Sequence, residues 1–186
     1  MAQGKTQFVG AAGQFYLAYG LAVREINASL TLGNAPSVDV LASSPDGRHS
    51  LSFQVKTSRN AYLQKRYGSE GYEWDVGAGV IGKHRESFWY AFIDLQENKE
   101  GWDPIVFFVP SRWVAEFVKP DFSRFRYFLP TTAKDLTHER WDLVQGFLSG
   151  EKGAIDWANS WPEDKLVKWG TGSQQDAPAD ARTSRP

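Results

Sequence analysis

The stretch VDVLASSPDGRHSLSFQVKTS, residues 38–58, is the part of the chain that determines the expected fold. Apolar residues occupy every second position over 38–42, and apolar and polar residues alternate over 51–57, which is the pattern of two half-buried β-strands. The Pro-Asp-Gly segment between them is typical of a turn, so we expect an antiparallel hairpin. A hairpin fixes which side chains face one another across its two strands.

The register of this hairpin follows from burial of its apolar side chains. With the turn centred in the Pro-Asp-Gly segment, Val40 faces Phe53, and the apolar partners share one face. A three-residue loop would shift the register by one position and expose that face, so burial favours the first register. In that register Asp39 faces Gln54, with Cβ atoms roughly 4.5–5.5 Å apart.

Lys56 projects from the same strand face as Gln54, so we expect Asp39, Gln54 and Lys56 to cluster. The Asp39 carboxylate, the Gln54 amide oxygen and the Val55 backbone carbonyl are the kind of oxygen ligands that Mg²⁺ or Mn²⁺ prefers. Such an ion keeps several waters and often binds a substrate phosphate. Lys56 would then orient a metal-bound water for attack on that phosphate and stabilise the charge that forms on it. The alternative is a cross-strand polar pair with a nearby Asp–Lys salt bridge and no catalytic role.

A helix is expected before the hairpin, over residues 8–26. Its apolar positions at helical spacing are Ala11, Phe15, Ala18, Ala22 and Ile26, flanked by Leu17 and Leu21. Gln14 lies on the side of Leu17 and Leu21, as a polar residue at the edge of an apolar face.

The remaining pattern predicts an α/β domain over residues 1–150, with a central mixed β-sheet flanked by helices. Its other expected elements are a Gly-rich loop over 59–82, strands over 88–95, 105–109 and 125–129, and helices over 111–119 and 138–148. Residues 151–169 contain three tryptophans and are expected to pack on this domain. Residues 170–186 have the composition of a disordered tail.

The composition excludes several classes of protein. There is no cysteine, so disulfides and thiolate catalysis are excluded, and the three histidines lack the spacing of zinc ligands. No apolar run is long enough to span a membrane, and the first residues lack the apolar segment of a signal peptide. We therefore expect no membrane partner and a cytoplasmic protein. The net charge of −1 gives no support for nucleic-acid binding.

The distribution of charge is more informative than its sum. Between Asp46 and Glu70 there is no acidic residue, and the basic residues there are Arg48, Lys56, Arg59, Lys65 and Arg66. This segment is either a solvated loop or a local phosphate-binding surface.

The later GAGVIGKH, residues 77–84, fits G-x-G-x-x-G but lacks a strand before it and a helix after it, so nucleotide binding is rejected.

PSVDV and FQVKTS, residues 36–40 and 53–58, resemble the PD-(D/E)xK nuclease superfamily, the restriction-endonuclease-like fold. Asp39 matches the family's first acid, and Gln54-Val55-Lys56 matches its acid-x-Lys element in a QxK variant. The helix sequence GAAGQFYLAYGLAVR is similar to the family's GxxGE helix, with Gln14 in place of Glu. A Lys-His pair before a central strand, here Lys83 and His84, is similar to a small bacterial branch.

The resemblance covers roughly residues 8–130 and implies an αβββαβ core and hydrolysis of DNA with Mg²⁺ or Mn²⁺. It implies that Asp39, Gln54 and the Val55 carbonyl hold the metal and that Lys56 positions the water. Gln14 would contact the metal through water or orient Lys56. The expected DNA contacts are Arg59, Lys65, Arg66, Lys83 and His84.

Cutting of both DNA strands would favour a homodimer. Two alternatives to a nuclease remain open from the sequence. One is a catalytically silent protein of the same fold that binds DNA or a partner protein. The other is an interaction protein that uses the aromatic residues of 59–82 and 151–169.

Overall fold

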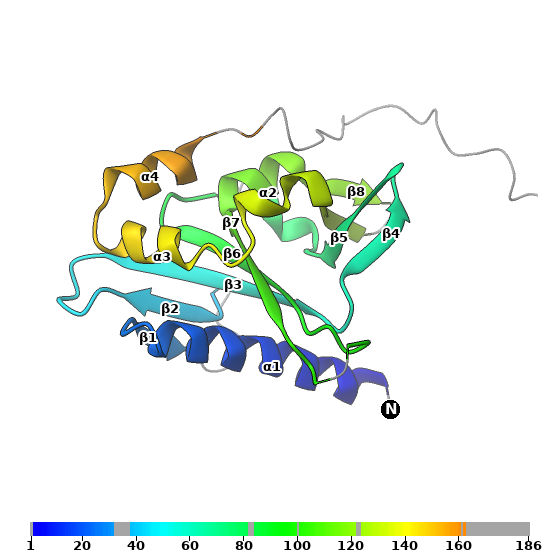
Figure 1. Ribbon diagram of the computed structural model, residues 1–186, viewed down its shortest axis with the longest axis horizontal. Coiled ribbons are helices and arrows are strands. Elements are labelled where there is room, and N and C mark those ends of the chain that lie inside the picture. The colour runs from blue at the N-terminus through cyan, green and yellow to red at the C-terminus, as the bar shows by residue number, and fades with distance from the viewer. Residues whose placement is uncertain are drawn as a thin grey trace, which may run out of the picture.

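The computed structural model describes residues 2–31, 38–81, 84–99, 101–121, 124–160 and 162, and it contains two β-sheets with flanking helices (Figure 1). The helices are α1 (Ala2–Ala22), α2 (Ser111–Phe117), α3 (Trp141–Leu148) and α4 (Lys152–Asn159), with 3₁₀ turns η1 (Ala78–Val80) and η2 (Thr131–Leu136). The strands are β1 (Asn27–Leu30), β2 (Val40–Ser43), β3 (Ser50–Ser58), β4 (Tyr62–Arg66), β5 (Ser69–Asp75), β6 (Phe88–Asp94), β7 (Ile105–Pro110), β8 (Lys119–Asp121) and β9 (Arg124–Pro130). The α/β class is confirmed.

The larger sheet has five strands in the order β1-β2-β3-β6-β7. Strands β2 and β3 pair antiparallel with Val40 opposite Phe53, so the predicted hairpin register is confirmed. Strand β3 then pairs with β6 in parallel, which makes the sheet mixed. A parallel pair requires a crossover connection between its strands.

That crossover differs from both expectations. Where the αβββαβ order has a helix, and where we predicted a long loop over 59–82, the chain forms the β4–β5 hairpin and η1. Tyr67 and Gly68 form its turn with φ angles of 52° and 85°, as a two-residue hairpin turn requires. The loop prediction was wrong because Tyr72 and Trp74 are aromatic strand residues that pair with β9 in a second sheet, ordered β4-β5-β9-β8.

Strand β6 divides the interior into two apolar clusters. All seven of its residues are buried, and they alternate between the two faces of the large sheet. Trp89 and Ala91 pack with α1, α3 and α4, whereas Tyr90 and Phe92 pack with the second sheet and α2. Helix α1 and the second sheet therefore lie on opposite faces of the large sheet.

Helix α1 buries a different face from the one that the apolar spacing suggests. Leu17 and Leu21 are fully buried against the large sheet, but Phe15 is 63% exposed and Ala22 is also exposed. Small residues allow this orientation, because a Cβ at Gly13 would overlap Thr57 of β3. Apolar residues occur on both sides of the helix, so spacing alone does not identify its buried side.

The described part of the expected Trp-rich extension forms α4. Trp157 packs with its ring centroid 5.3 Å from that of Trp89 and 5.0 Å from that of Trp113. It thereby links α4 to both apolar clusters. The expected tail over 170–186 lies outside the described residues.

Candidate active site

The end of β2 brings Asp39 out of the strand ladder. Pairing of β2 with β3 ends at Val40, and the Asp39 backbone N–H donates to the Phe53 carbonyl at 2.8 Å. The Asp39 carbonyl accepts from the Thr31 backbone N–H at 3.0 Å. The expected cross-strand pair of Asp39 with Gln54 is therefore not formed, because the chain bends one residue before the ladder would reach it.

The Asp39 side chain instead joins three elements. Its Oδ2 accepts a hydrogen bond from the Val55 backbone N–H on β3 at 2.7 Å. Its Oδ1 accepts one from the Gln14 side-chain amide of α1 at 3.2 Å. The carboxylate thus occupies the position where another strand residue would accept from Val55. A charged acceptor makes the shorter of these bonds stronger than an ordinary ladder bond.

The close packing of α1 on β3 makes the Gln14 contact possible. Gly13 lies against Thr57, where any side chain would collide, so the helix axis approaches the strand closely. Gln14, the next residue, is half-buried and reaches the strand edge where Asp39 emerges. Gln14 and Asp39, both predicted as site residues, are therefore in direct contact.

Gln54 and Lys56 leave β3 from the other face. In the parallel register they lie beside Tyr90 and Phe92, which face the second sheet, whereas Val55 lies beside Ala91 on the α1 side. Adjacent partners in a sheet point to the same face. The expected cluster of three side chains is therefore split, with Asp39 toward α1 and the other two on the opposite face.

Lys56 is half-buried and is not part of an ion pair or hydrogen bond within the described ranges. Its ammonium group therefore has no carboxylate partner among those residues. Beyond Phe53, β3 continues to Ser58 and pairs with β6 alone among the described strands. A ligand at this strand edge would meet Asp39 from one side and Lys56 from the other.

The donor set at Asp39 suits a hard cation. Gln14 directs its amide nitrogen at Asp39, which leaves its amide oxygen to accept, and both Asp39 oxygens retain a lone pair. The Val55 carbonyl points to the same strand edge as its N–H. Nowhere in the described chain do three His, Cys, Asp or Glu residues gather as metal ligands. The oxygen donors fit a weakly held Mg²⁺ that keeps waters and binds substrate phosphate, with a single protein charge.

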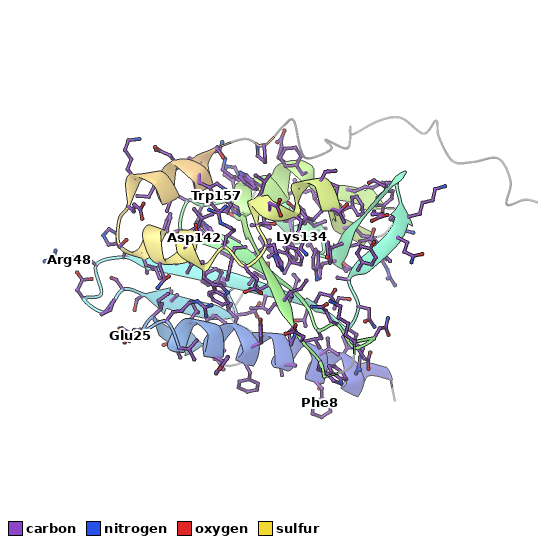
Figure 2. The ribbon with its side chains drawn as sticks, viewed as in Figure 1. Phe8, Glu25, Arg48, Lys134, Asp142 and Trp157 are labelled. Atoms are coloured by element: carbon purple, nitrogen blue, oxygen red, sulfur yellow. The ribbon has the colours of Figure 1, made fainter. Side chains whose placement is uncertain are left out.

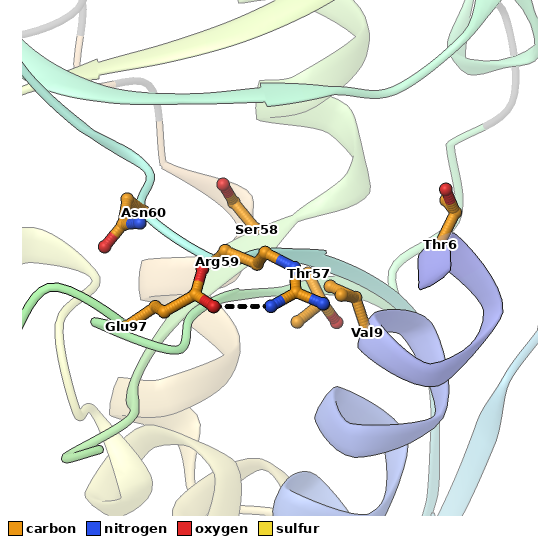
Figure 3. Close-up of a pocket in the computed structure, with 7 residues that line it drawn as sticks. All are labelled: Thr6, Val9, Thr57, Ser58, Arg59, Asn60 and Glu97. Atoms are coloured by element: carbon orange, nitrogen blue, oxygen red, sulfur yellow. Dashed lines mark hydrogen bonds and ion pairs between the residues drawn. The ribbon is translucent and has the colours of Figure 1, made fainter. Parts of the chain in front are cut away.

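A hollow of about 450 Å³ lies at the carboxyl end of β3, beside the start of α1 (Figure 3). Ligands of open α/β sheets commonly bind outside the carboxyl ends of strands. Arg59 lines this hollow and forms an ion pair with Glu97 at 2.6 Å. Thr57 also lines it, and its buried hydroxyl makes no hydrogen bond in the part of the chain that the structure describes. Arg59, a predicted DNA contact, therefore already has an internal partner.

The other predicted DNA contacts do not form one surface with Arg59. Lys65 and Arg66 lie on β4, where Lys65 is exposed and Arg66 pairs with Glu73 at 3.3 Å. His84 is exposed in the segment before β6. Lys83 lies outside the described residues. The basic segment of the sequence is thus divided between the end of the large sheet and the second sheet.

Asp94 is a residue that the sequence reasoning missed. It ends β6 beside Ser58 and is 3% exposed, and burial raises the pKa of its carboxyl group. It accepts a hydrogen bond from the Gln96 backbone N–H at 3.1 Å, which holds the turn after β6. An acid at the end of an apolar run, as in FWYAFIDL, was the available signal. Its bond to the backbone indicates a structural role.

Comparison with protein-family models, curated proteins and solved structures finds no match to this chain. None of the helices in the described ranges has both the length and the hydropathy that crossing a membrane requires. The geometry at Asp39 is therefore the feature of this chain that points to a function.

Proposed function

We propose that this protein is a metal-dependent nuclease that hydrolyses phosphodiester bonds in DNA. The observation that carries the proposal is the meeting of α1, β2 and β3 at one carboxylate, through the hydrogen bonds of Asp39 with Gln14 and Val55. These residues come from the three elements that carry the site in the PD-(D/E)xK pattern. The strand order β1-β2-β3-β6, with β3 and β6 parallel, supports the same reading.

Each residue would have a distinct role. Asp39 would hold Mg²⁺ or Mn²⁺ together with the oxygens of Gln14 and Val55, and the ion would polarise the phosphate as a Lewis acid. The Val55 N–H fixes the orientation of the Asp39 carboxylate at 2.7 Å. Lys56 would bring an uncompensated positive charge to the attacking water and the phosphate. Gln54, on the Lys56 face, would contact the same water or the DNA.

DNA would lie along the edge of β3, and the exposed side chains of Lys65 and His84 would contact its phosphate backbone. A cytoplasmic location fits a DNA substrate and a chain without cysteine.

A second candidate is a DNA-binding protein of the same fold without cleavage. The specific observation in its favour is that both oxygens of Asp39 already accept hydrogen bonds from within the chain. In this case Asp39 would only fasten α1 to the sheet, and Lys56 would serve as a phosphate contact.

The test is cleavage of supercoiled plasmid and branched DNA with Mg²⁺ or Mn²⁺, against an EDTA control. We expect metal-dependent nicking by the wild type and none by Asp39→Asn, which keeps an oxygen acceptor for Val55 but loses the charge. Asp75→Asn, at an exposed aspartate on β5, is the matched control and should cleave normally.

A wild type that shifts DNA in a salt-dependent manner but leaves every DNA form intact would favour the second candidate. Absence of binding at low salt would overturn both candidates.

A further inference from the structure

Helix α1 presents an apolar face to solvent. Phe8 is 76% exposed, Phe15 63% and Tyr19 66%, and the Phe8 side chain points away from the rest of the molecule (Figure 2). No charged residue occurs between Lys5 and Arg24. Solvent-exposed helix faces normally carry charged or polar side chains, so this one has the character of an interface.

The exposed positions follow a regular pattern of large and small side chains. Along the helix they alternate in spacings of four and three residues, and they are Phe8, Ala12, Phe15, Tyr19 and Ala22, with Val23 beside the last. Such a 4-3 spacing keeps side chains in one stripe that faces a partner helix. We call these six residues the outer stripe.

The buried side of α1 prevents the outer stripe from turning inward. A Cβ at Gly13 would overlap Thr57 of β3, and one at Gly20 would overlap the Trp141 ring of α3. Leu17 and Leu21, on the same side, are fully buried. The helix is therefore fixed by close contacts at two points, and the residues that the structure describes leave its outer stripe uncovered.

We propose that the outer stripe binds a second copy of this chain, with the two α1 helices packed antiparallel about a two-fold axis near Phe15. This arrangement places Phe8 over Ala22 of the second copy and Tyr19 over its Ala12, so each large ring meets a small residue. Phe15 meets its own equivalent at the axis. A two-fold interface must be complementary to itself, and this order of large and small residues satisfies that requirement.

Area and charge both favour a second copy as the occupant. From the exposed fractions, Phe8, Phe15, Tyr19 and Val23 offer on the order of 500 Å² of apolar surface. A stable interface needs about 800 Å² from each partner, so the stripe would supply more than half. Because the stripe is uncharged, two identical faces meet without repulsion. Basic residues, which a helix lying on an anionic membrane carries along its polar face, are absent between Lys5 and Arg24.

This proposal does not depend on the nuclease proposal, because it concerns the opposite side of α1 and its test uses no DNA. The measurement is molar mass by light scattering after size exclusion, over a concentration series. The wild type should have twice the chain mass of 20.9 kDa, and Phe15→Arg should have the single chain mass. Ile81→Arg, at an exposed apolar residue outside α1, should remain dimeric.

A pair of swaps separates specific packing from simple stickiness. Ala12→Phe adds apolar surface but fills the space for Tyr19 of the second copy, so it should weaken the dimer. Adding Tyr19→Ala should restore it, because the large and small residues have only exchanged places. Circular dichroism should be unchanged in all variants, since every substituted position is exposed.

Three results would overturn the proposal. They are a monomeric wild type throughout the series, a dimer that survives Phe15→Arg, and a dimer that Ala12→Phe strengthens. A monomer that floats with anionic lipid vesicles would assign the outer stripe to a membrane surface instead.

Discussion

Two regions of the molecule contain a partly or fully buried carboxylate near basic residues, and they differ in whether the carboxylate is paired with basic side chains or with neutral donors. On the second sheet, Glu73 pairs with Arg66 at 3.3 Å and with Arg126 at 2.9 Å. At the edge of the large sheet, the donors to the Asp39 carboxylate among the described residues are the neutral groups of Gln14 and Val55. Charge is neutralised internally in the first region and remains available to a ligand in the second.

Under the proposed function, this difference separates structural charge from charge that acts on a ligand. The Glu73 side chain is 7% exposed and also accepts from the Tyr67 hydroxyl at 2.8 Å, so its basic partners compensate a buried charge. Near Asp39 the available cation, Lys56, lies across β3 and has no carboxylate partner among the described residues. Proximity in sequence grouped Arg66 with Lys56, whereas the fold places them in different electrostatic settings.

Loss of the Lys56 charge should have the largest effect on activity. Lys56→Met keeps the aliphatic stem but removes the charge, so we expect DNA cleavage to fall about 10²–10³-fold, as when a transition-state charge partner is lost. Arg66→Met should leave cleavage unchanged because Arg66 is engaged by Glu73. Rates of plasmid nicking for the two variants measure this, with thermal unfolding as the control for folding. Equal losses in both variants would contradict the distinction.

A substitution in α1 tests how the Asp39 region is assembled. In Gly13→Ala the new methyl group collides with Thr57, so the helix must move off β3 and the Gln14–Asp39 hydrogen bond should be lost. We expect a loss of about 1–3 kcal/mol in the free energy of unfolding. Gly10→Ala is the matched control, since nothing lies within 4 Å of the added atom. Denaturant titration should find Gly10→Ala at least as stable as the wild type, and equal effects at both positions would refute the packing argument.

The contributions of Lys65 and Arg66 to DNA affinity should also differ, by a smaller amount. Lys65 and Arg66 are adjacent on β4, but Lys65 is exposed whereas Arg66 contacts Glu73. For Lys65→Gln we expect the slope of log affinity against log salt to fall by about 0.9, the value for one phosphate contact. For Arg66→Gln the change should be smaller. Fluorescence anisotropy over a salt series measures both slopes, and the reverse order would show that Glu73 does not hold Arg66 away from DNA.

The smallest expected effect is on the pH dependence of stability and concerns His138. Its ring packs beside Phe107, in the apolar cluster of Tyr90 and Phe92, with ring centroids 5.3 Å apart. Burial, followed by the charge of Lys134, lowers its pKa below the usual 6.5. As the pH falls, His138 is therefore protonated in the unfolded chain before it is protonated in the folded chain. The free energy of unfolding is highest above pH 6.5 and decreases as the pH falls from 6.5 toward the lower pKa of the folded state. His138→Phe should make the melting temperature less dependent on pH, because the variant takes up a fraction of one proton less on unfolding. An unchanged slope between pH 7 and 5 would contradict it.

The hairpin was predictable from sequence because alternation and burial act locally. Val40 and Phe53 could share a buried face in one register alone, and that register is observed. The second sheet was not predictable from the same reasoning, because Tyr72 and Trp74 become strand residues through pairing with the distant β9. The buried face of α1 was also missed, since apolar residues such as Phe15 and Leu17 occur on both of its sides.

The sequence predicted which residues belong to the candidate site better than it predicted how they are arranged. Asp39, Gln14 and Val55 were identified from sequence and lie in contact. The orientation of Asp39 away from Gln54 depends on two features without a local signal, namely the chain bend before Val40 and the approach of α1 at Gly13. Both are tertiary effects, which strand alternation does not encode.

The proposed divalent-cation site at Asp39, Gln14 and Val55 can be tested directly by titration of the ¹⁵N-labelled protein with Mn²⁺. A bound paramagnetic ion broadens nearby amide signals, and no DNA substrate is needed. We predict that the Val55 backbone amide and the Gln14 side-chain amide broaden first, and that Asp39→Asn abolishes this. Broadening confined to exposed carboxylates such as Asp142, with Val55 unaffected, would contradict the account.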